Sequence, residues 1–133
     1  MTDAAATEMI HAQVPLCVTL GITADAASPE KVVLSLDWAP NLCTGNDVLH
    51  GGIVMALADS AGAVCAFLNL PAGAGGTTTI ESKTNFLVAT RSGTLKAHSR
   101  PLHIGRRVIV IETEIRRDDG TLAAKTSQSQ AVL

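Results

Sequence analysis

The feature that most constrains this chain is a long apolar run in its middle, HGGIVMALADSAGAVCAFLNL, which extends from His50 to Leu70. It begins at a His-Gly-Gly and fades before Pro71, so it predicts an α-helix that is apolar on almost every side. Such a helix has to be wrapped by other elements of the protein. One carboxylate, Asp59, lies in its middle, where a buried and unpaired charge is costly enough that proteins pair it, protonate it or use it.

The same run is about long enough to cross a bilayer, but its composition disfavours a membrane span. A charge at the centre costs roughly 2.5–3.5 kcal/mol on insertion, whereas each large aliphatic side chain recovers only ~0.3–0.6 kcal/mol. The run is mostly Ala and Gly, and no Lys or Arg flanks it. We therefore expect the core helix of a soluble protein, with no membrane partner.

Local patterns in the remaining sequence predict one short helix and about six strands. Residues 3–13, within an N-terminal segment 1–14, predict the helix, which Pro15 ends. Alternation predicts a weak strand over 18–22 and a stronger one over 32–38. After the central helix the period changes to two, which predicts four strands in a meander over 77–87, 95–100, 109–115 and 121–133. We expect one α+β domain over 1–133, in which a curved antiparallel sheet of about six strands wraps the long central helix.

Composition and charge narrow the function classes. The chain has 133 residues, 47% hydrophobic and 17% charged, which is typical of one globular domain. A formal charge of −2 gives no reason to expect nucleic acid as a partner. The three cysteines lack CxxC spacing, which predicts neither a zinc site nor a disulfide framework, and the N-terminus has no secretory signal pattern, so we expect a reducing cytoplasm.

The predicted helix separates small residues from bulky ones when it is turned by 100° per residue. Around Asp59 the large neighbour is Met55, and the others are small: Gly52, Ala56, Gly62, Ala63 and Ala66. The opposite side carries Ile53, Leu57, Val64 and Leu68, which we expect to fill the concave sheet. Asp59 is then either a structural acid, satisfied by a backbone amide, Lys83 or Arg107, or a general base or nucleophile in a cleft beside the small residues.

The start of the helix favours the functional interpretation. Gly51 and Gly52 leave the first-turn amides uncovered, and these amides sit at the positive end of the helix dipole. They can hold a carbonyl oxygen as negative charge develops on it. A thioester could lie along the small side between these amides and Asp59, although ~12–13 Å of helix axis separates the two positions.

The segment LHGGIVMALADSAGA resembles the hotdog-fold acyl-CoA thioesterases, in the branch of the phenylacetate-degradation and 4-hydroxybenzoyl-CoA thioesterases. The similarity continues through Asn85-Phe86-Leu87, the turn at Gly93, Gly105-Arg106 and the acidic-Gly hairpin, so that it covers roughly residues 32–132. The resemblance implies a central helix wrapped by an antiparallel sheet. It also implies homodimers or homotetramers, as dimers of dimers, with active sites at the subunit interface.

The resemblance implies roles for particular residues. Asp59 would act as base toward water or as nucleophile on the thioester carbonyl, the Gly51 amide would polarise that carbonyl, and His50 would shape the helix start. Thr79 best matches a hydroxyl residue of the facing subunit that positions water. Many relatives have an Asn six residues before the His, where this chain has Thr44, so Asn46 or Asn41 would have to take that role.

Other residues are candidates for contacts with substrate. Gly52 and Met55 border Asp59, and Met55 could adapt to aryl or aliphatic groups. Arg106 and Arg107, near Arg100 and His103 at a predicted turn, could bind coenzyme A phosphates or simply be solvated. Glu81 is expected on the same strand face as Thr79, Lys83 and Asn85, where it could line the cleft or form an ion pair along a dimer seam.

The first functional hypothesis is an acyl-CoA thioesterase that needs no metal and no cofactor other than the coenzyme A of its substrate. A non-catalytic module that binds acyl-CoA in the same groove is the second. A hotdog dehydratase or hydratase is the third, and it is weaker because His50 lies nine positions before Asp59, about 180° around the helix. The acyl or aryl group is not determined by the sequence.

Overall fold

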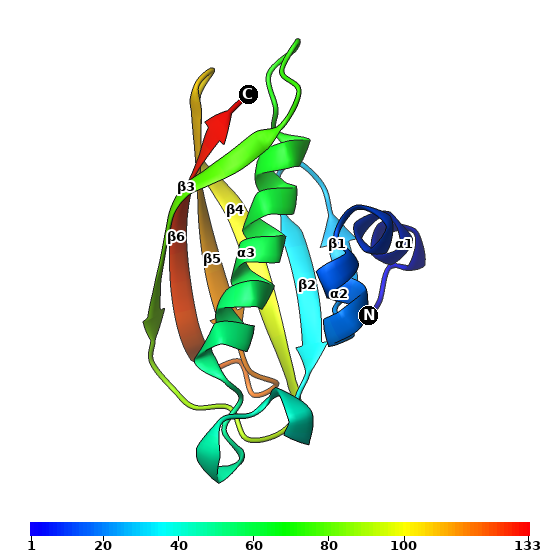
Figure 1. Cartoon of the computed structure of the whole chain (residues 1–133), viewed down its shortest axis with the longest axis vertical. Coiled ribbons are helices and arrows are strands. Elements are labelled where there is room, and N and C mark those ends of the chain that lie inside the picture. Colours follow the sequence, from blue (N-terminus) through cyan, green and yellow to red (C-terminus); the bar gives the residue numbers. More distant parts are fainter.

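The computed structural model describes residues 1–133, with α3 (Gly51–Leu68) at its centre and one antiparallel sheet curved around it (Figure 1). The sheet has six strands: β1 (Thr23–Ala27), β2 (Val32–Asp37), β3 (Thr77–Phe86), β4 (Thr94–Ile104), β5 (Val108–Arg116) and β6 (Leu122–Val132). Helices α1 (Ala4–Gln13) and α2 (Pro15–Leu20) lie beside β1, and the short 3-10 turns η1 (Pro40–Leu42) and η2 (Gly45–Asp47) precede α3. The predicted α+β architecture is confirmed.

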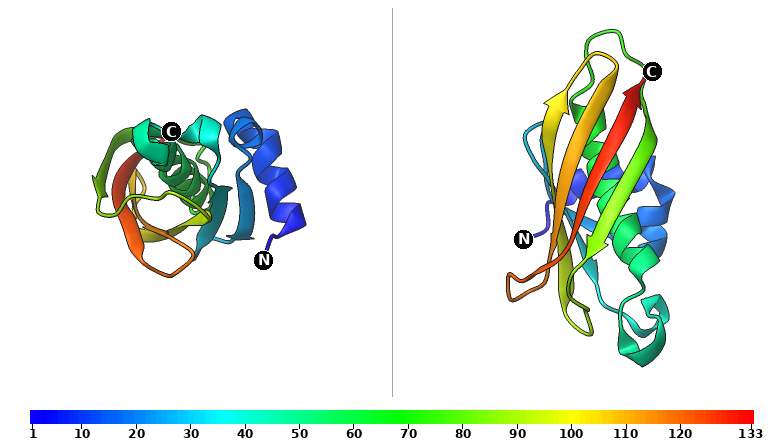
Figure 2. Two further views of the ribbon diagram at one scale, coloured as in Figure 1. Left: turned by 90° about the horizontal axis from the view of Figure 1, so that it is seen from below. Right: turned by 90° about the vertical axis from the view of Figure 1, so that its left-hand side faces the viewer.

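The core lies between α3 and the concave face of the sheet (Figure 2). Small side chains let the helix approach closely, because Ala58, Ala61 and Cys65 are fully buried together with Leu57. They pack with aliphatic side chains of β2, β4 and β5, among them Leu34, Leu36, Leu95, Ile109, Ile111 and Ile115. By length and composition α3 could cross a membrane, but here it is the helix of this core.

The expected division of α3 into a small open side and a bulky buried side is partly wrong. Gly62 and Ala66, expected beside Asp59, are buried, whereas Ile53, Val64 and Leu68 are only partly buried. The open side carries Gly52 and Met55 with Asp59, as expected, and also Phe67, which was not expected there. The reason is that a short side chain gains a place against the sheet by allowing close packing, which a hydrophobic pattern alone does not indicate.

The predicted strand over 18–22 is wrong, because this segment forms α2 and the following loop. Pro15 stands at the first turn of α2, where its fixed φ suits a helix, and Gly21 ends it at φ 72°. These two helix signals outweigh the apolar alternation. Cys17, a residue of α2, is fully buried in the core. The first strand begins only at Thr23.

The prediction that the last four strands form a meander is wrong for β3, which does not pair with β4. The sheet order is β1-β2-β4-β5-β6-β3, so β4, β5 and β6 form a meander while β3 lies at the far edge beside β6. The place next to β4 is taken by β2, which pairs with it from Val32↔Ser99 to Asp37↔Thr94. The chain from β3 to β4 therefore passes the end of the molecule at which α3 begins (Figures 1 and 2).

A bulge in β3 changes which of its side chains face inward. Thr79 pairs with Gln130 and Glu81 pairs with Ser129, so Ile80 is an extra residue without a partner. Residues directly opposite each other share a face of the sheet, and Gln130 is buried on the inner face. The expectation that Glu81 shares the face of Thr79 is therefore wrong, because the bulge puts Glu81 on the outer face.

Candidate active site

The N-terminus of α3 leaves one amide free. The ring of His50 caps the helix, where its Nδ1 accepts a hydrogen bond of 2.8 Å from the Gly52 amide. The amides of Ile53 and Val54 both donate to the His50 carbonyl. The Gly51 N–H has no acceptor in the chain, and it sits at the positive end of an 18-residue helix. It can therefore donate a hydrogen bond to a ligand oxygen.

An apolar cavity of about 330 Å³ lies beside this free amide. The Phe86 ring forms one wall, so close to Gly51 that a Cβ on this residue would stand 3.3 Å from the ring. The cavity is lined by Thr44, Val48, Leu49, Gly51, Val54, Phe86, Leu87, Val88, Ala89, Thr90 and Ala123. Its size is near the lower limit for ligand pockets, and its walls suit an apolar group attached to a carbonyl.

Asp59 lies on the open side of α3, two turns after Gly51, and its side chain is exposed in the isolated chain. It is therefore not the buried carboxylate that the apolar sequence around it predicts. Neither Lys83 nor Arg107 pairs with it, since no ion pair of the chain includes Asp59. Its partner is the Gln128 side chain, whose Nε2 donates to Asp59 Oδ1 over 3.1 Å.

Two glutamines of β6 contact candidate site residues, although the sequence patterns above did not predict either of them. Gln128 and Gln130 are each 1% exposed and face inward, and Gln130 Nε2 donates to Thr79 Oγ1 over 2.7 Å. A signal for them is present in the sequence, because Thr126, Gln128 and Gln130 continue the inward positions of an alternating strand. Long polar side chains on the core side of a strand need polar partners, and such partners often belong to a functional site.

Two of the three candidate site residues in the loop before α3 line hollows at the start of this helix. Thr44 lines the apolar cavity beside Gly51, whereas Asn41 lines a second hollow together with His50 and Gly52. Asn46 is exposed in η2 and adopts a left-handed backbone conformation with φ 61°. Asn41 and Thr44 thus each share a hollow with residues at the start of α3, and Asn46 lines neither hollow.

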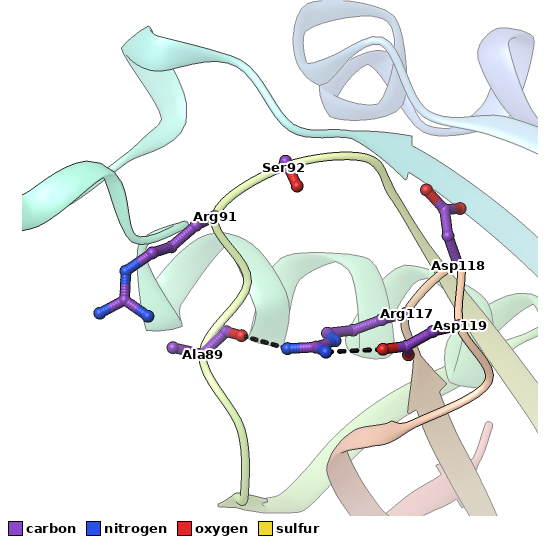
Figure 3. Close-up of a pocket in the computed structure, with 6 residues that line it drawn as sticks. All are labelled: Ala89, Arg91, Ser92, Arg117, Asp118 and Asp119. Carbon is purple, nitrogen blue, oxygen red and sulfur yellow. Dashed lines mark hydrogen bonds and ion pairs between the residues drawn. The ribbon is translucent and has the colours of Figure 1, made fainter.

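The arginines occupy both ends of the molecule. Arg106 and Arg107 form the β4–β5 turn, at the end opposite to Gly51 (Figure 1). At the Gly51 end a polar hollow of about 370 Å³ adjoins the apolar cavity and shares Ala89 with it. In this hollow Arg117 donates to the Ala89 carbonyl over 3.1 Å and to Asp119 over 2.7 Å, while Arg91 points away from both aspartates (Figure 3).

The cysteines do not form part of this arrangement. Burial raises the pKa of the Cys65 thiol to about 11, and burial likewise raises the pKa of Cys17. A thiol with such a pKa is protonated at neutral pH and is a poor nucleophile. The candidate groups that remain are the Asp59 carboxylate, the Thr79 hydroxyl and the Gly51 N–H, the last as a hydrogen-bond donor.

Comparison with known proteins gives concordant matches. The family model described as Thioesterase superfamily matches residues 46–124. The chain is 31% identical to 1,4-dihydroxy-2-naphthoyl-CoA hydrolase of Escherichia coli over 86 residues, 65% of this chain and 62% of that protein.

Solved structures of thioesterases superpose on most of this chain. A mutant of thioesterase PA1618 from Pseudomonas aeruginosa has a TM-score of 0.89 at 26% identity, with 98% of this chain and 96% of that chain covered. Thioesterase HI1161 from Haemophilus influenzae has a TM-score of 0.83 at 25% identity, with coverages of 89% and 82%.

Proposed function

Because this chain belongs to the thioesterase superfamily, we propose that it hydrolyses an acyl- or aryl-CoA thioester to the carboxylic acid and free coenzyme A. The long helix wrapped by a six-stranded sheet is the hotdog fold that the sequence resemblance implied. The observation that carries the proposal is the free Gly51 amide, which opens beside an apolar cavity on the helix that also bears Asp59.

The thioester carbonyl is proposed to bind at Gly51. The acyl or aryl group occupies the cavity next to the Phe86 ring, and the carbonyl oxygen accepts a hydrogen bond from the Gly51 N–H. Negative charge develops on this oxygen when the carbonyl is attacked, and a preorganised amide at a helix N-terminus stabilises that charge. The His50 cap fixes the first turn of α3 and so holds the amide in place.

The position of Asp59 supports an active site shared by two copies of the chain. Eight residues of helix, ~12 Å along the axis, separate Gly51 from Asp59, whereas a base has to lie within ~3 Å of the water or group on which it acts. A two-fold partner with its α3 antiparallel would bring the partner subunit's Asp59 beside Gly51 and create two equivalent sites. The free edge of β3 offers the surface for such pairing, and two dimers could form a tetramer.

In the proposed reaction Asp59 takes a proton from water as the water oxygen adds to the thioester carbon. The tetrahedral intermediate then collapses, the carbon–sulfur bond breaks, and the leaving coenzyme A thiolate takes up the proton that Asp59 removed from the water. Thr79, which Gln130 orients, positions the water. If Asp59 instead attacks the carbon directly, the coenzyme A thiolate leaves and a mixed anhydride forms. Water then cleaves the anhydride, and a single turnover in ¹⁸O-water labels the Asp59 carboxylate when the water attacks the aspartyl carbonyl.

The charged part of coenzyme A is proposed to contact Arg106 and Arg107. In one chain the β4–β5 turn lies at the end opposite to the start of α3. The proposed two-fold axis would bring the same turn of the partner subunit to the end where Gly51 lies. Arg matches phosphate oxygens well in charge and geometry. Glu81 faces outward from β3, on the side away from Thr79, and is not included in this arrangement.

The proposal is tested with a panel of phenylacetyl-CoA, benzoyl-CoA and straight-chain acyl-CoA thioesters, with release of the free thiol as the readout. We expect turnover of at least one thioester, and a loss of about 10²–10⁴-fold in Asp59→Asn with the fold and ligand binding preserved. Tight binding of every thioester without turnover would identify a non-catalytic module instead. Unchanged hydrolysis by Asp59→Asn would exclude the proposed mechanism.

A further inference from the structure

The Gln128 side chain reaches from β6 toward the open side of α3. Gln128 is 1% exposed, yet its Nε2 contacts Asp59 Oδ1 at 3.1 Å, and Asp59 is exposed. Asp59 Oδ2 has no hydrogen-bond partner within the chain. The amide of Gln128 therefore holds one carboxylate oxygen from inside the protein and leaves the other free.

A glycine in α3 makes room for this contact. A Cβ on Gly62 would stand 1.6 Å from Gln128 Oε1 and 2.6 Å from its Cδ, so any larger residue would displace the amide. Glycine within a helix is unfavourable relative to alanine, since it adds backbone entropy to the unfolded state. The absence of a side chain at Gly62 therefore makes room for the Gln128 side chain, which passes beneath the helix.

The Gln128 amide is also incompletely satisfied. Its Oε1 is the one buried side-chain polar atom of the chain without a hydrogen-bond partner. The opposite orientation of the amide would place two acceptor oxygens together, so an ionised Asp59 requires the orientation seen here. A buried polar atom without a partner destabilises the fold, and the contact of the same amide with Asp59 gives a reason for a glutamine at this position.

We infer that Gln128 is a positioning residue, which fixes the Asp59 carboxylate on the open side of α3 with Oδ2 free to accept the proton of the attacking water. This inference rests on the proposed function. Gln128 does not touch the substrate, so its contribution is to the geometry of the base rather than to binding. A small displacement of a catalytic group lowers the rate of the chemical step without a matching change in affinity.

Gln128→Met tests the inference, because methionine has nearly the shape of glutamine but no amide. With benzoyl-CoA, or the panel thioester turned over fastest, we expect kcat to fall about 10- to 100-fold while KM changes less than about twofold. The thermal midpoint should stay the same or rise, because the unpartnered Oε1 is removed. A kcat equal to that of the wild type would overturn the inference.

Thr126→Val is the matched control. Thr126 is fully buried two residues before Gln128 on the same strand face, and it bonds to Thr84 rather than to Asp59. This variant removes a buried hydrogen bond of β6 but should keep kcat. An equal loss of kcat in Thr126→Val would mean that any disturbance of β6 lowers the rate, and the positioning role would be refuted.

Gly62→Ala and Gly62→Ala/Gln128→Ala give a second, independent test. Gly62→Ala alone should lower both the thermal midpoint and kcat, since its methyl group collides with the amide. Removing the amide in the double variant should restore the thermal midpoint but not kcat. Recovery of both would show that Gln128 acts on stability only, and the inference would fail.

Asp59→Asn distinguishes a failure of the proposed mechanism from a failure of the positioning role of Gln128. If Asp59→Asn retains full activity, the proposed mechanism fails and the positioning role fails with it. If Asp59→Asn is inactive while Gln128→Met has the kcat of the wild type, only the positioning role fails. In the Asp59→Asn background, Gln128→Met should cause no further loss, because the two residues act as a unit.

Discussion

Gln130 and Thr79 are joined by a 2.7 Å hydrogen bond at the point where β3 contains one residue more than β6. This bond fixes Thr79 on the inner face and leaves Ile80 as the extra, unpaired residue. Ile80 is 62% exposed on an edge strand whose other side has no partner within the chain. A large aliphatic side chain on an open edge is typical of a surface that pairs with another copy.

Ile80→Lys is therefore predicted to prevent formation of the proposed dimer, because a lysine on an edge strand opposes pairing. Sedimentation velocity on the wild type and the variant measures the change. Activity should fall together with the dimer fraction, because the proposed site draws on two chains. The monomeric state of the wild-type protein at micromolar concentration would contradict the shared site.

Gly51→Pro removes the proposed oxyanion donor without removing a structural hydrogen bond. Proline is favoured at the first position of a helix, and His50 before it already has an extended backbone at φ −59°, ψ 134°. We expect kcat to fall about 10²–10³-fold. Gly51→Ala is the control: it adds the same Cβ beside Phe86 but keeps the N–H, so its loss should be much smaller. Equal activity of the two variants would show that the amide is not used.

Asp25 is predicted to make stability depend on pH. Burial opposes its ionisation, but hydrogen bonds from Lys96 and Ser35 outweigh this effect and hold the pKa of Asp25 below its usual value. A carboxyl group with a lowered pKa stabilises the fold above its unfolded pKa, and this contribution is lost as the pH falls through the folded pKa.

Asp25→Asn should therefore lower the free energy of unfolding at pH 7 by about 1 kcal/mol, a modest value because Lys96 is 38% exposed. The difference from the wild type should shrink below about pH 4. Urea unfolding at pH 7, 5 and 3 measures it. A difference that stays constant over this range would show that the charge of Asp25 is not the cause.

Thiol alkylation should distinguish the three cysteines of the native protein. Cys17 and Cys65 are fully buried and burial raises the pKa of both thiols, while Cys43 is only partly buried. Since the thiolate is the reacting form, iodoacetamide at pH 8 should modify Cys43 first and the other two only after unfolding. Mass spectrometry of tryptic peptides identifies the sites. Rapid modification of Cys65 under native conditions would contradict the packing of α3.

Several features of the fold could be predicted from local sequence. The apolar run after His50 predicts α3 with little error, because an N-terminal His-Gly-Gly and a continuous apolar segment act within the segment itself. The turn at Asp118-Asp119-Gly120 likewise joins β5 to β6 as expected. The strand expected over 18–22 failed because five alternating residues are a weaker signal than Pro15 and Gly21 at the two ends of α2.

Asp59 and Gly51 could be chosen from the sequence, since their types and spacing on one helix already indicate a carboxylate and a free amide. The residues that contact Asp59 and Thr79 could not be predicted from local sequence. Gln128 lies 69 residues after Asp59, and its contact exists only because β6 passes beneath Gly62. The bulge that separates the faces of Thr79 and Glu81 depends on the pairing of β3 with β6, not on β3 alone.

The sequence by itself determined which segments form the central helix and most of the strands, through the period of their apolar residues. It also determined which polar groups the central helix carries, because both features follow from neighbouring residues. Only the tertiary structure decided which strand lies at the edge, which side of α3 is open and which amide holds Asp59. The physical reason is that strand pairing and close packing join residues far apart in the chain. Many such arrangements satisfy the same local pattern, and the packing of the whole core selects among them.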